Sequence, residues 1–427
     1  MNQWYNVEKI REQFPALTRV ENGFPMAYLD GPGGTQVPRR VADKVTEYLL
    51  HHNANSHGQF ATSRESDALH EAAREAMADF LGCEANEIVF GDSSSTNNFK
   101  LALAIARDLE AGDEIIITDL DHESNRSPWR QLEERGLVVK SVAVDPDTCT
   151  MNQEDYRQKL TNKTKVVALN WASNGVGTIT DIKPMIEMAR EVGALTIVDA
   201  VHYAPHRPID VKAMGMDFLV CSVYKFFGPH MGVMYGRLDM MEKLRTYRVM
   251  VEGNEHSPEK IETGTPQFEL ISGSAEAVEF IASIGREYEE WAEAHHPEWM
   301  KGLEGRRRHV VAGMLAVDAY EEPLAKKLRT ALRALPKVKV FGPPEGEPRT
   351  STVSFLVEGM HAEKVSTALG EKAICVWDGH YYARQLINGT LGLEPVGGLV
   401  RIGLAPYTTE EEIDRTIAAI EAIVAGK

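Results

Sequence analysis

The sequence predicts an α/β fold in which a large domain with a mainly parallel sheet is joined to a smaller α+β domain. A chain of 427 residues is too long for one hydrophobic core and long enough for about two domains. Its middle alternates short apolar runs with helical stretches, a pattern typical of parallel strands joined by crossover helices. After residue 270 a long charged helical stretch replaces this alternation. We therefore expect the large domain over residues 25–270 and the small domain over residues 1–24 and 271–427.

The strands expected in the large domain are continuous apolar runs. They cover residues 87–90, 114–118, 165–170, 195–200 and 218–222. A run that is apolar at every position is buried on both faces, which indicates a parallel sheet covered by helices on both sides. Two of these helices are expected over residues 99–109 and 182–192, the second ending at Gly193 after apolar residues spaced along one face.

The smaller domain is expected to begin with a helix over residues 275–293. Strands are expected over residues 338–340, 351–357 and 373–376. Thr409 and Glu412 have the spacing of a capping box at the start of a final helix, whose apolar residues recur on one face.

Composition excludes several classes of function. The chain carries 46 basic and 63 acidic residues, a formal net charge of −17, and no basic block. This acidic balance argues against nucleic acid or anionic membranes as partners. No apolar stretch approaches the roughly 18 residues of a membrane span, and the N-terminus lacks an apolar signal region. We therefore expect a cytoplasmic protein.

The four cysteines, Cys83, Cys149, Cys221 and Cys375, are far apart in the sequence. None has the C-x-x-C spacing of a zinc or redox site, and no H-E-x-x-H occurs among the histidines. We expect neither a disulfide framework nor a metal site.

Polar residues follow several of the expected strands, and ligands of open α/β sheets bind at the carboxyl ends of the strands. Ser94 and Ser95 open a helix, where they could cradle a phosphate or cap the helix. His122 could stack on an aromatic cofactor or cap the next helix. Asn174 could donate to a phenolate oxygen or lie in a turn. Each residue alone has an ordinary structural explanation.

Lys225 and Asp199 add a more specific signal. Each stands at or just after the end of an apolar run, with Lys225 in the segment Ser-Val-Tyr-Lys-Phe-Phe-Gly-Pro. A lysine and an acid at two strand ends suit a pyridoxal phosphate enzyme, in which the lysine forms the Schiff base and the acid pairs with the pyridinium nitrogen. Taken singly, most lysines are solvated and Asp199 could equally cap a helix.

Together these residues resemble the class V aminotransferase family, specifically its cysteine desulfurase-like branch, over nearly the whole chain. Residues 28–35 are similar to the family motif Y-L-D-N-A-A-T-T, residues 53–57 to N-A-N-x-H, and residues 222–229 to S-G-H-K-x-x-G-P. Residues 262–266 match E-T-G-T-P without change. The resemblance implies fold type I of the PLP-dependent transferases, with a mainly parallel mixed seven-stranded sheet. It also implies pyridoxal 5'-phosphate, a small amino-acid substrate and a homodimer with a shared active site.

The resemblance further assigns roles to individual residues. Lys225 is the Schiff-base lysine and proton shuttle, and His122 and Asp199 complete the catalytic set. Thr265 is expected to reach the phosphate of the partner subunit. The expected cofactor-binding residues are Ser94, Ser95, His122, Asn174, Asp199, His202, Ser222, Tyr224, Lys225 and Thr265. The expected substrate-binding residues are Arg401, whose guanidinium fork suits a carboxylate, with His57, Asp30 and His380.

The departures from the family pattern bear on the reaction. Tyr382 stands where group II desulfurases carry the nucleophilic cysteine, and a phenol cannot form a persulfide. Cys375 lies earlier, inside an expected strand, where a small buried apolar residue is common. Trp377 replaces a family arginine and His202 replaces a glutamine. The rings of Trp377, His202, Tyr381 and Tyr382 suggest an aromatic pocket for something larger than cysteine, although ordinary packing would explain them as well.

We therefore expect a PLP-dependent lyase that cleaves a Cβ–S bond by β-elimination, a reaction that needs no cysteine nucleophile. Two alternatives stay open. One is a class V aminotransferase or epimerase-type reaction at Cα, and the other is true cysteine desulfuration using another cysteine.

Overall fold

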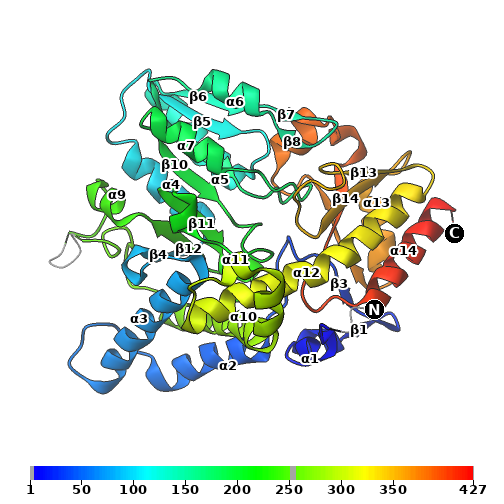
Figure 1. The fold of residues 1–427 in the computed structure, drawn as a ribbon, viewed down its shortest axis with the longest axis horizontal. Coiled ribbons are helices and arrows are strands. Elements are labelled where there is room, and N and C mark those ends of the chain that lie inside the picture. The colour runs from blue at the N-terminus through cyan, green and yellow to red at the C-terminus, as the bar shows by residue number, and fades with distance from the viewer. Residues whose placement is uncertain (1–3, 251–255, 427) are drawn as a thin grey trace.

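The computed structural model describes residues 4–250 and 256–426 and is built around a seven-stranded sheet (Figure 1). Along the sheet lie β4 (Ile88–Gly91), β12 (Gly232–Gly236), β11 (Phe218–Ser222), β10 (Leu195–Asp199), β9 (Thr164–Asn170), β5 (Glu114–Thr118) and β6 (Val138–Val142). Strand β12 runs antiparallel to both neighbours, and the other pairs are parallel. The predicted α/β fold with a mainly parallel mixed seven-stranded sheet is confirmed.

Both faces of this sheet are buried, as the continuous apolar runs predicted. Side chains of successive residues on one strand point to opposite faces. Ile115 and Ile117 accordingly join one apolar cluster with Trp129, whereas Ile116 joins a second, larger cluster with Phe80. All five side chains are fully or almost fully buried.

Helices cover the two faces. Helices α4 (Ser94–Ile105) and α5 (Glu123–Arg130) contribute to the smaller cluster. Helices α3 (Ala61–Leu81), α7 (Lys183–Glu191), α10 (Phe268–His295) and α12 (Gly305–Ala334) contribute to the larger one. Helix α4 begins at Ser94 rather than at the predicted residue 99, because the Ser93 hydroxyl caps it by accepting from the Thr96 N–H at 3.1 Å.

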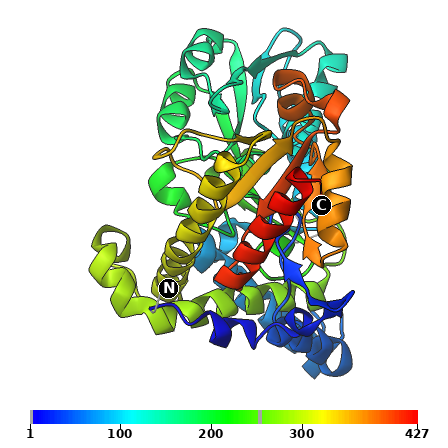
Figure 2. The ribbon, with the colours of Figure 1, turned by 90° about the vertical axis from the view of Figure 1, so that its right-hand side faces the viewer.

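Helix α10 begins at Phe268 rather than at the predicted residue 275, since its first turns are apolar and buried against α2 (Arg39–Glu47) and α3. It crosses α12 closely. A Cβ at Gly285 would lie 1.6 Å from the carbonyl oxygen of His309, so only glycine permits this approach. Helix α12 then continues to the second sheet, beside α14 (Glu410–Val424) (Figure 2). The predicted capping box of Thr409 and Glu412 is present at the start of α14.

The second sheet has four strands in the order β13 (Val338–Phe341), β14 (Thr352–Val357), β17 (Leu399–Gly403) and β16 (Trp377–Gly379), all antiparallel. The strand expected over residues 373–376 is shorter, β15 (Ile374–Cys375), and pairs instead with β3 (Ala27–Tyr28). A further bridge joins Asp30 to Gly403. The N-terminal segment is thus tied to the C-terminal part of the chain, and the predicted domain boundaries stay a prediction.

The remaining elements are short and connect these layers. The helices are α1 (Val7–Arg11), α6 (Gln153–Lys159), α8 (Val211–Met214), α9 (Leu238–Lys243), α11 (Pro297–Met300) and α13 (Ala362–Gly370), and the strands are β1 (Val20–Glu21), β2 (Phe24–Pro25), β7 (Val144–Asp145) and β8 (Thr150–Met151). Among the helices of residues 4–250 and 256–426, none combines the length and the apolar character needed to cross a membrane.

Candidate active site

A cavity of about 1090 Å³ lies at the carboxyl ends of β4, β5, β9, β10 and β11. Most of the residues predicted for the site line it: Ser94, Ser95, His122, Asn174, Asp199, His202, Ser222, Tyr224, Lys225, His380 and Arg401. The strand-end rule for parallel sheets therefore located the cavity correctly.

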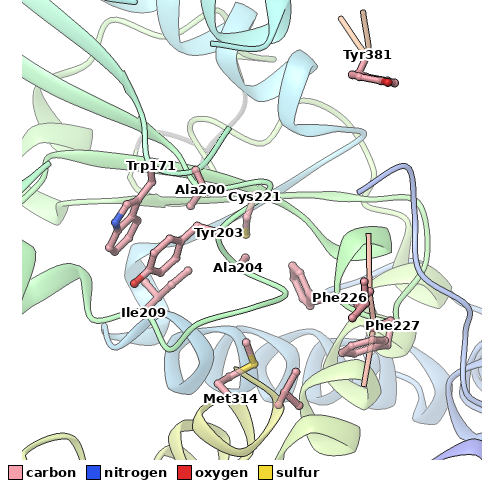
Figure 3. Close-up of a cluster of buried hydrophobic side chains, with 14 of the residues drawn as sticks. Trp171, Ala200, Tyr203, Ala204, Ile209, Cys221, Phe226, Phe227, Met314 and Tyr381 are labelled. Atoms are coloured by element: carbon pink, nitrogen blue, oxygen red, sulfur yellow. The ribbon is translucent and has the colours of Figure 1, made fainter. Parts of the chain in front are cut away.

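Lys225 is held in place by the two residues that follow it. Phe226 stacks on Phe80 of α3 with ring centres 4.6 Å apart, and Phe227 packs edge-on against Phe280 of α10 at 5.1 Å. Both rings are buried in the larger apolar cluster, part of which Figure 3 shows. This anchoring fixes the backbone of Lys225 at the floor of the cavity, where its amine donates a hydrogen bond to the carbonyl oxygen of Pro32.

Burial lowers the pKa of Lys225 to about 7, and the nearby cation of Arg401 adds to the effect. The carboxylates of Asp30 and Asp199 act in the opposite direction without offsetting it. A substantial share of the amine is therefore neutral near pH 7. A neutral amine is the form that attacks a carbonyl carbon and accepts a proton.

Asp199 ends β10 and is buried beneath the same cavity. One of its oxygens accepts the Val201 N–H at 2.9 Å. Burial raises the pKa of Asp199 to about 6, despite this hydrogen bond and the nearby Lys225. A cationic ring nitrogen placed against the carboxyl group would stabilise its ionised form and would itself be held protonated.

His122 caps the N-terminus of α5. Its Nδ1 accepts the Ser124 N–H at 3.0 Å, which leaves the ring proton on Nε2. Burial lowers the pKa of His122 to about 4, and the cation of Lys225 adds to that shift. The imidazole is thus neutral at physiological pH and presents a flat, uncharged ring to the cavity.

The N-terminus of α4 forms a possible anion cradle on the cavity wall. Ser94 and Ser95 stand in its first turn, whose N–H groups have no acceptor within the helix. The Ser222 hydroxyl donates to the Ser94 hydroxyl at 2.9 Å and so joins the cradle from β11. A Cβ at Gly232 would lie 2.2 Å from the carbonyl carbon of Ser93, so glycine there lets β12 approach the start of the helix.

Arg401, in β17, brings the second sheet into the site. Its Nη2 donates to Asp30 Oδ1 at 3.0 Å and its Nη1 to the carbonyl oxygen of Asn174 at 3.1 Å. Its guanidinium also lies 4.2 Å from the ring centre of Tyr381. Arg401 Nε and Asn174 Oδ1 are among the buried polar atoms that have no partner. Unpaired polar atoms on a cavity wall indicate a ligand that supplies the missing hydrogen bonds.

Asp30, predicted to bind the substrate, is not among the residues that line the cavity, and its assignment stays a prediction. Asp30 reaches the site through its ion pair with Arg401. Gly33 makes room for it, because a Cβ there would lie 2.0 Å from Asp30 Oδ2. The position of Asp30 therefore controls which Arg401 donors remain for a substrate.

His202 lines the cavity and is neutral. Its Nε2 lies within hydrogen-bond distance of the hydroxyl groups of Thr350, at 3.1 Å, and Thr352, at 2.9 Å. Burial moves the pKa of His202 well below its ordinary value. His202 lies in the loop that follows β10, and its contact with Thr352 therefore connects this loop to β14 of the second sheet.

Besides Asp30, two predicted site residues do not line the cavity in this chain. Thr265 is exposed, as expected of a residue that would contact a partner subunit. His57 is also exposed, and its N–H donates to Asp67 on α3 at 3.1 Å. Their assignments to the site stay predictions.

Sequence reasoning missed several cavity residues, and two of them are polar groups close to the predicted ones. Asn170 ends β9 with a buried side-chain oxygen that has no partner, and Glu123 begins α5. The N–H of Glu123 donates to the carbonyl oxygen of Tyr382 at 2.8 Å. The strand-end position of Asn170 was a usable signal, whereas the contact made by Glu123 depends on the tertiary fold.

Two consecutive tyrosines, Tyr381 and Tyr382, line the cavity. Tyr381 is buried, whereas Tyr382 is 66% exposed on the cavity wall. No cysteine lines the described cavity. Cys375 lies in β15, and burial raises the pKa of its thiol, so it is protonated at neutral pH.

The chain is similar to known proteins over nearly its whole length. The family profile described as "Aminotransferase class-V" matches residues 27–311 and 308–416. The aminotransferase-like protein FGM3 of Gibberella zeae is 33% identical over 431 residues, covering 98% of this chain and 99% of that protein. A probable cysteine desulfurase of Vibrio cholerae is 30% identical over 434 residues, covering 98% of each. The apo structure of a cysteine desulfurase from Thermococcus onnurineus NA1 aligns with a TM-score of 0.84 at 26% identity, covering 98% of each chain.

Proposed function

This chain belongs to the class V aminotransferase family, and on that basis we propose that it uses pyridoxal 5'-phosphate to cleave the Cβ–S bond of an amino acid by β-elimination. One observation carries the proposal. Lys225 and Asp199 line one cavity whose wall presents Tyr382 and, among the described residues, no cysteine. The sequence resemblance implies that Tyr382 stands where group II desulfurases carry their nucleophile.

The residues present fit this cofactor. Ser94, Ser95 and Ser222 would hold its phosphate at the positive end of α4. Asp199 would pair with its ring nitrogen, and the face of His122 would cover its ring. Asn174 lies on the same cavity wall. Its Nδ2 donates one hydrogen bond to the Tyr381 carbonyl oxygen at 2.9 Å and has a second N–H that could bond the ring oxygen. When bound, the cofactor supplies an electron sink that stabilises negative charge at the Cα of the substrate.

Lys225 and Arg401 would divide the remaining work. A neutral Lys225 amine is able to take the Cα proton, which its pKa of about 7 allows near neutral pH. Arg401 would orient the substrate carboxylate through its free Nε donor and through any Nη donor that Asp30 releases. The thiolate leaving from Cβ needs no protein nucleophile, so elimination is compatible with Tyr382 in place of cysteine.

Desulfuration would require a thiolate within reach of the substrate sulfur. Burial raises the pKa of each of the four cysteines, and all of them lie outside the cavity lining of the described residues. A reaction at Cα that leaves the β-substituent intact uses the same Lys225 and Asp199. The aminotransferase-like name of the Gibberella relative makes it the second candidate.

Product analysis separates these reactions. Purified protein would be offered cysteine, cystine and S-substituted cysteines. Pyruvate and ammonia are expected, with sulfide from cysteine, the intact thiol from S-substituted cysteines and the hydropersulfide of cysteine from cystine. A keto acid that retains the sulfur substituent would refute elimination, and persulfide formed in the wild type but not in Cys375→Ala would establish desulfuration instead.

Lys225→Ala tests the site itself. The variant should lose the visible absorbance of the lysine-bound cofactor together with thiol release, because no other lysine lines the described cavity. Survival of that absorbance would show that the site has been assigned wrongly.

We also propose a cytoplasmic homodimer with a shared active site. Four unpaired cysteines suit a reducing compartment, and the exposed Thr265 suits a contact with the partner's cofactor phosphate. Mixing Lys225→Ala with Thr265→Ala chains tests the sharing. A heterodimer then has one site with neither change, so partial recovery of activity is expected, and no recovery would oppose a shared site.

A further inference from the structure

Two large aromatic side chains lie exposed on the wall of the cavity. Trp377 is 56% exposed and Tyr382 is 66% exposed, whereas Trp129 and Tyr381 are buried. Both exposed residues line the cavity. Ordinary core packing therefore does not account for these two rings, and their apolar surface remains available to a ligand.

Trp377 lies next to the arginine expected to bind the substrate carboxylate. In the antiparallel pair of β16 and β17, Trp377 is directly opposite Arg401. Directly opposed residues project to the same face of a sheet, with Cβ atoms about 4.5–5.5 Å apart. A substrate held at Arg401 thus has an indole ring beside it.

Tyr382 is fixed by its backbone. Its carbonyl oxygen accepts the Glu123 N–H at 2.8 Å, and its own N–H donates to His380 Nδ1 at 3.1 Å. Its φ of 58° places it in the left-handed region, a conformation that persists for a bulky residue only where its surroundings impose it. Its ring centre lies 5.4 Å from that of His122. The exposed phenol is thus a positioned part of the wall.

We propose that Trp377 and Tyr382 form a subsite for an aromatic or large apolar group carried on the sulfur of the substrate. The inference rests on the proposed β-elimination and names its substrate class, S-aryl or S-benzyl conjugates of cysteine. The cavity of about 1090 Å³ exceeds the roughly 300–1,000 Å³ usual for small-molecule sites, which leaves room for such a group beside the cofactor.

The reaction on such a conjugate balances without an oxidant. Lys225 takes the Cα proton, the Cβ–S bond breaks, and the sulfur leaves with the bonding electron pair and is protonated to the free thiol. The three-carbon remainder takes up one water and leaves as pyruvate and ammonium.

The test compares S-benzyl-L-cysteine with S-methyl-L-cysteine, which has the same scissile bond and no ring. In Trp377→Ala and in Tyr382→Ala, the ratio of kcat/KM for the benzyl over the methyl substrate should fall about tenfold, since ring contacts and buried apolar area are lost. Trp377→Phe should retain most of the preference. Trp299→Ala is the matched control, because Trp299 is also exposed, at 37%, but lies on α11 outside the cavity lining.

A binding measurement separates the subsite from the chemistry. Calorimetry would use the carbon isostere of S-benzyl-cysteine, in which a methylene replaces the sulfur, with norvaline as the small counterpart. The subsite is supported if the isostere binds more tightly than norvaline and if Trp377→Ala weakens that binding. This conclusion holds even if no substrate releases a thiol, because the lack of thiol release would refute only the proposed elimination. Unchanged selectivity and unchanged binding in both alanine variants would overturn the subsite and leave the elimination standing.

Discussion

Replacing Glu262 with alanine should destabilise the protein, because this side chain neutralises a buried arginine. Glu262 Oε2 accepts from Arg74 Nη2 at 2.7 Å, and Glu262 Oε1 accepts the Phe90 N–H at 2.7 Å. Arg74 is 3% exposed, and besides Glu262 it contacts the carbonyl oxygen of Ile88 and, at 3.8 Å, the largely exposed Glu259. The carboxylate therefore joins α3, β4 and the segment that leads to Thr265.

Two losses set the size of the effect. Leaving a buried charge without its partner costs about 3–5 kcal/mol, and an unpaired buried N–H costs about 1–3 kcal/mol. The two do not add fully, because the Ile88 carbonyl remains and Glu259 can move closer. We expect the free energy of unfolding to fall by about 4 kcal/mol, a large part of the about 5–15 kcal/mol usual for a folded protein.

Urea denaturation of the cofactor-free protein measures this change. Glu262→Gln keeps an acceptor for the Phe90 N–H and should be intermediate. Glu259→Ala is the control and should cost less than about 1 kcal/mol, since its pair with Arg74 is long and exposed. Replacing Arg74 with methionine in the Glu262→Ala background should recover part of the loss, because the unpaired charge is then gone. A loss below about 1 kcal/mol in Glu262→Ala would refute this reasoning.

Two further predictions concern the cavity. In the cofactor-free protein the pKa of Asp199 is raised to about 6 from an ordinary value of 3.8, so the folded state binds the proton of this carboxyl group more tightly than the unfolded state. The stabilisation from this proton is fully present below about pH 4 and is lost as the pH rises through about 6. This shift corresponds to about 3 kcal/mol, so Asp199→Asn should lessen the fall in unfolding free energy between pH 4 and pH 7 by that order, and an unchanged profile would contradict the assignment. Arg401→Lys should raise the KM for amino-acid substrates about tenfold or more with a smaller effect on kcat, because one ammonium cannot hold Asp30 and the Asn174 carbonyl and still offer a donor like Nε. Steady-state kinetics at saturating cofactor measures both constants, and equal KM values in the two proteins would count against a carboxylate-binding role.

The sequence predicted the elements that local pattern controls. Strands β5 and β11 have the predicted bounds, because a continuous apolar run between polar turns specifies a buried parallel strand. The parallel arrangement then implied that Lys225, Asp199 and His122 meet at one edge of the sheet, since each lies at or shortly after the end of a strand. The predicted starts of α4 and α10 were too late. The alternation of apolar and polar residues does not reveal the Ser93 cap of α4, nor does it reveal the apolar first turns of α10.

The sequence by itself therefore determined the large sheet, the lysine and acid at its edge, and the absence of a cysteine at position 382. Tertiary structure alone decided which donors of Arg401 are taken, since Asp30 lies 371 residues away in the chain. It also paired β15 with β3 and placed Trp377 opposite Arg401. Strand register between distant segments depends on packing across the whole fold, and a shift of one residue would turn each side chain to the other face. For that reason the chemistry expected at Cα and the aromatic residues of the pocket could be read from the sequence, whereas the positions of Trp377 opposite Arg401 and of Tyr382 beside His122 could not.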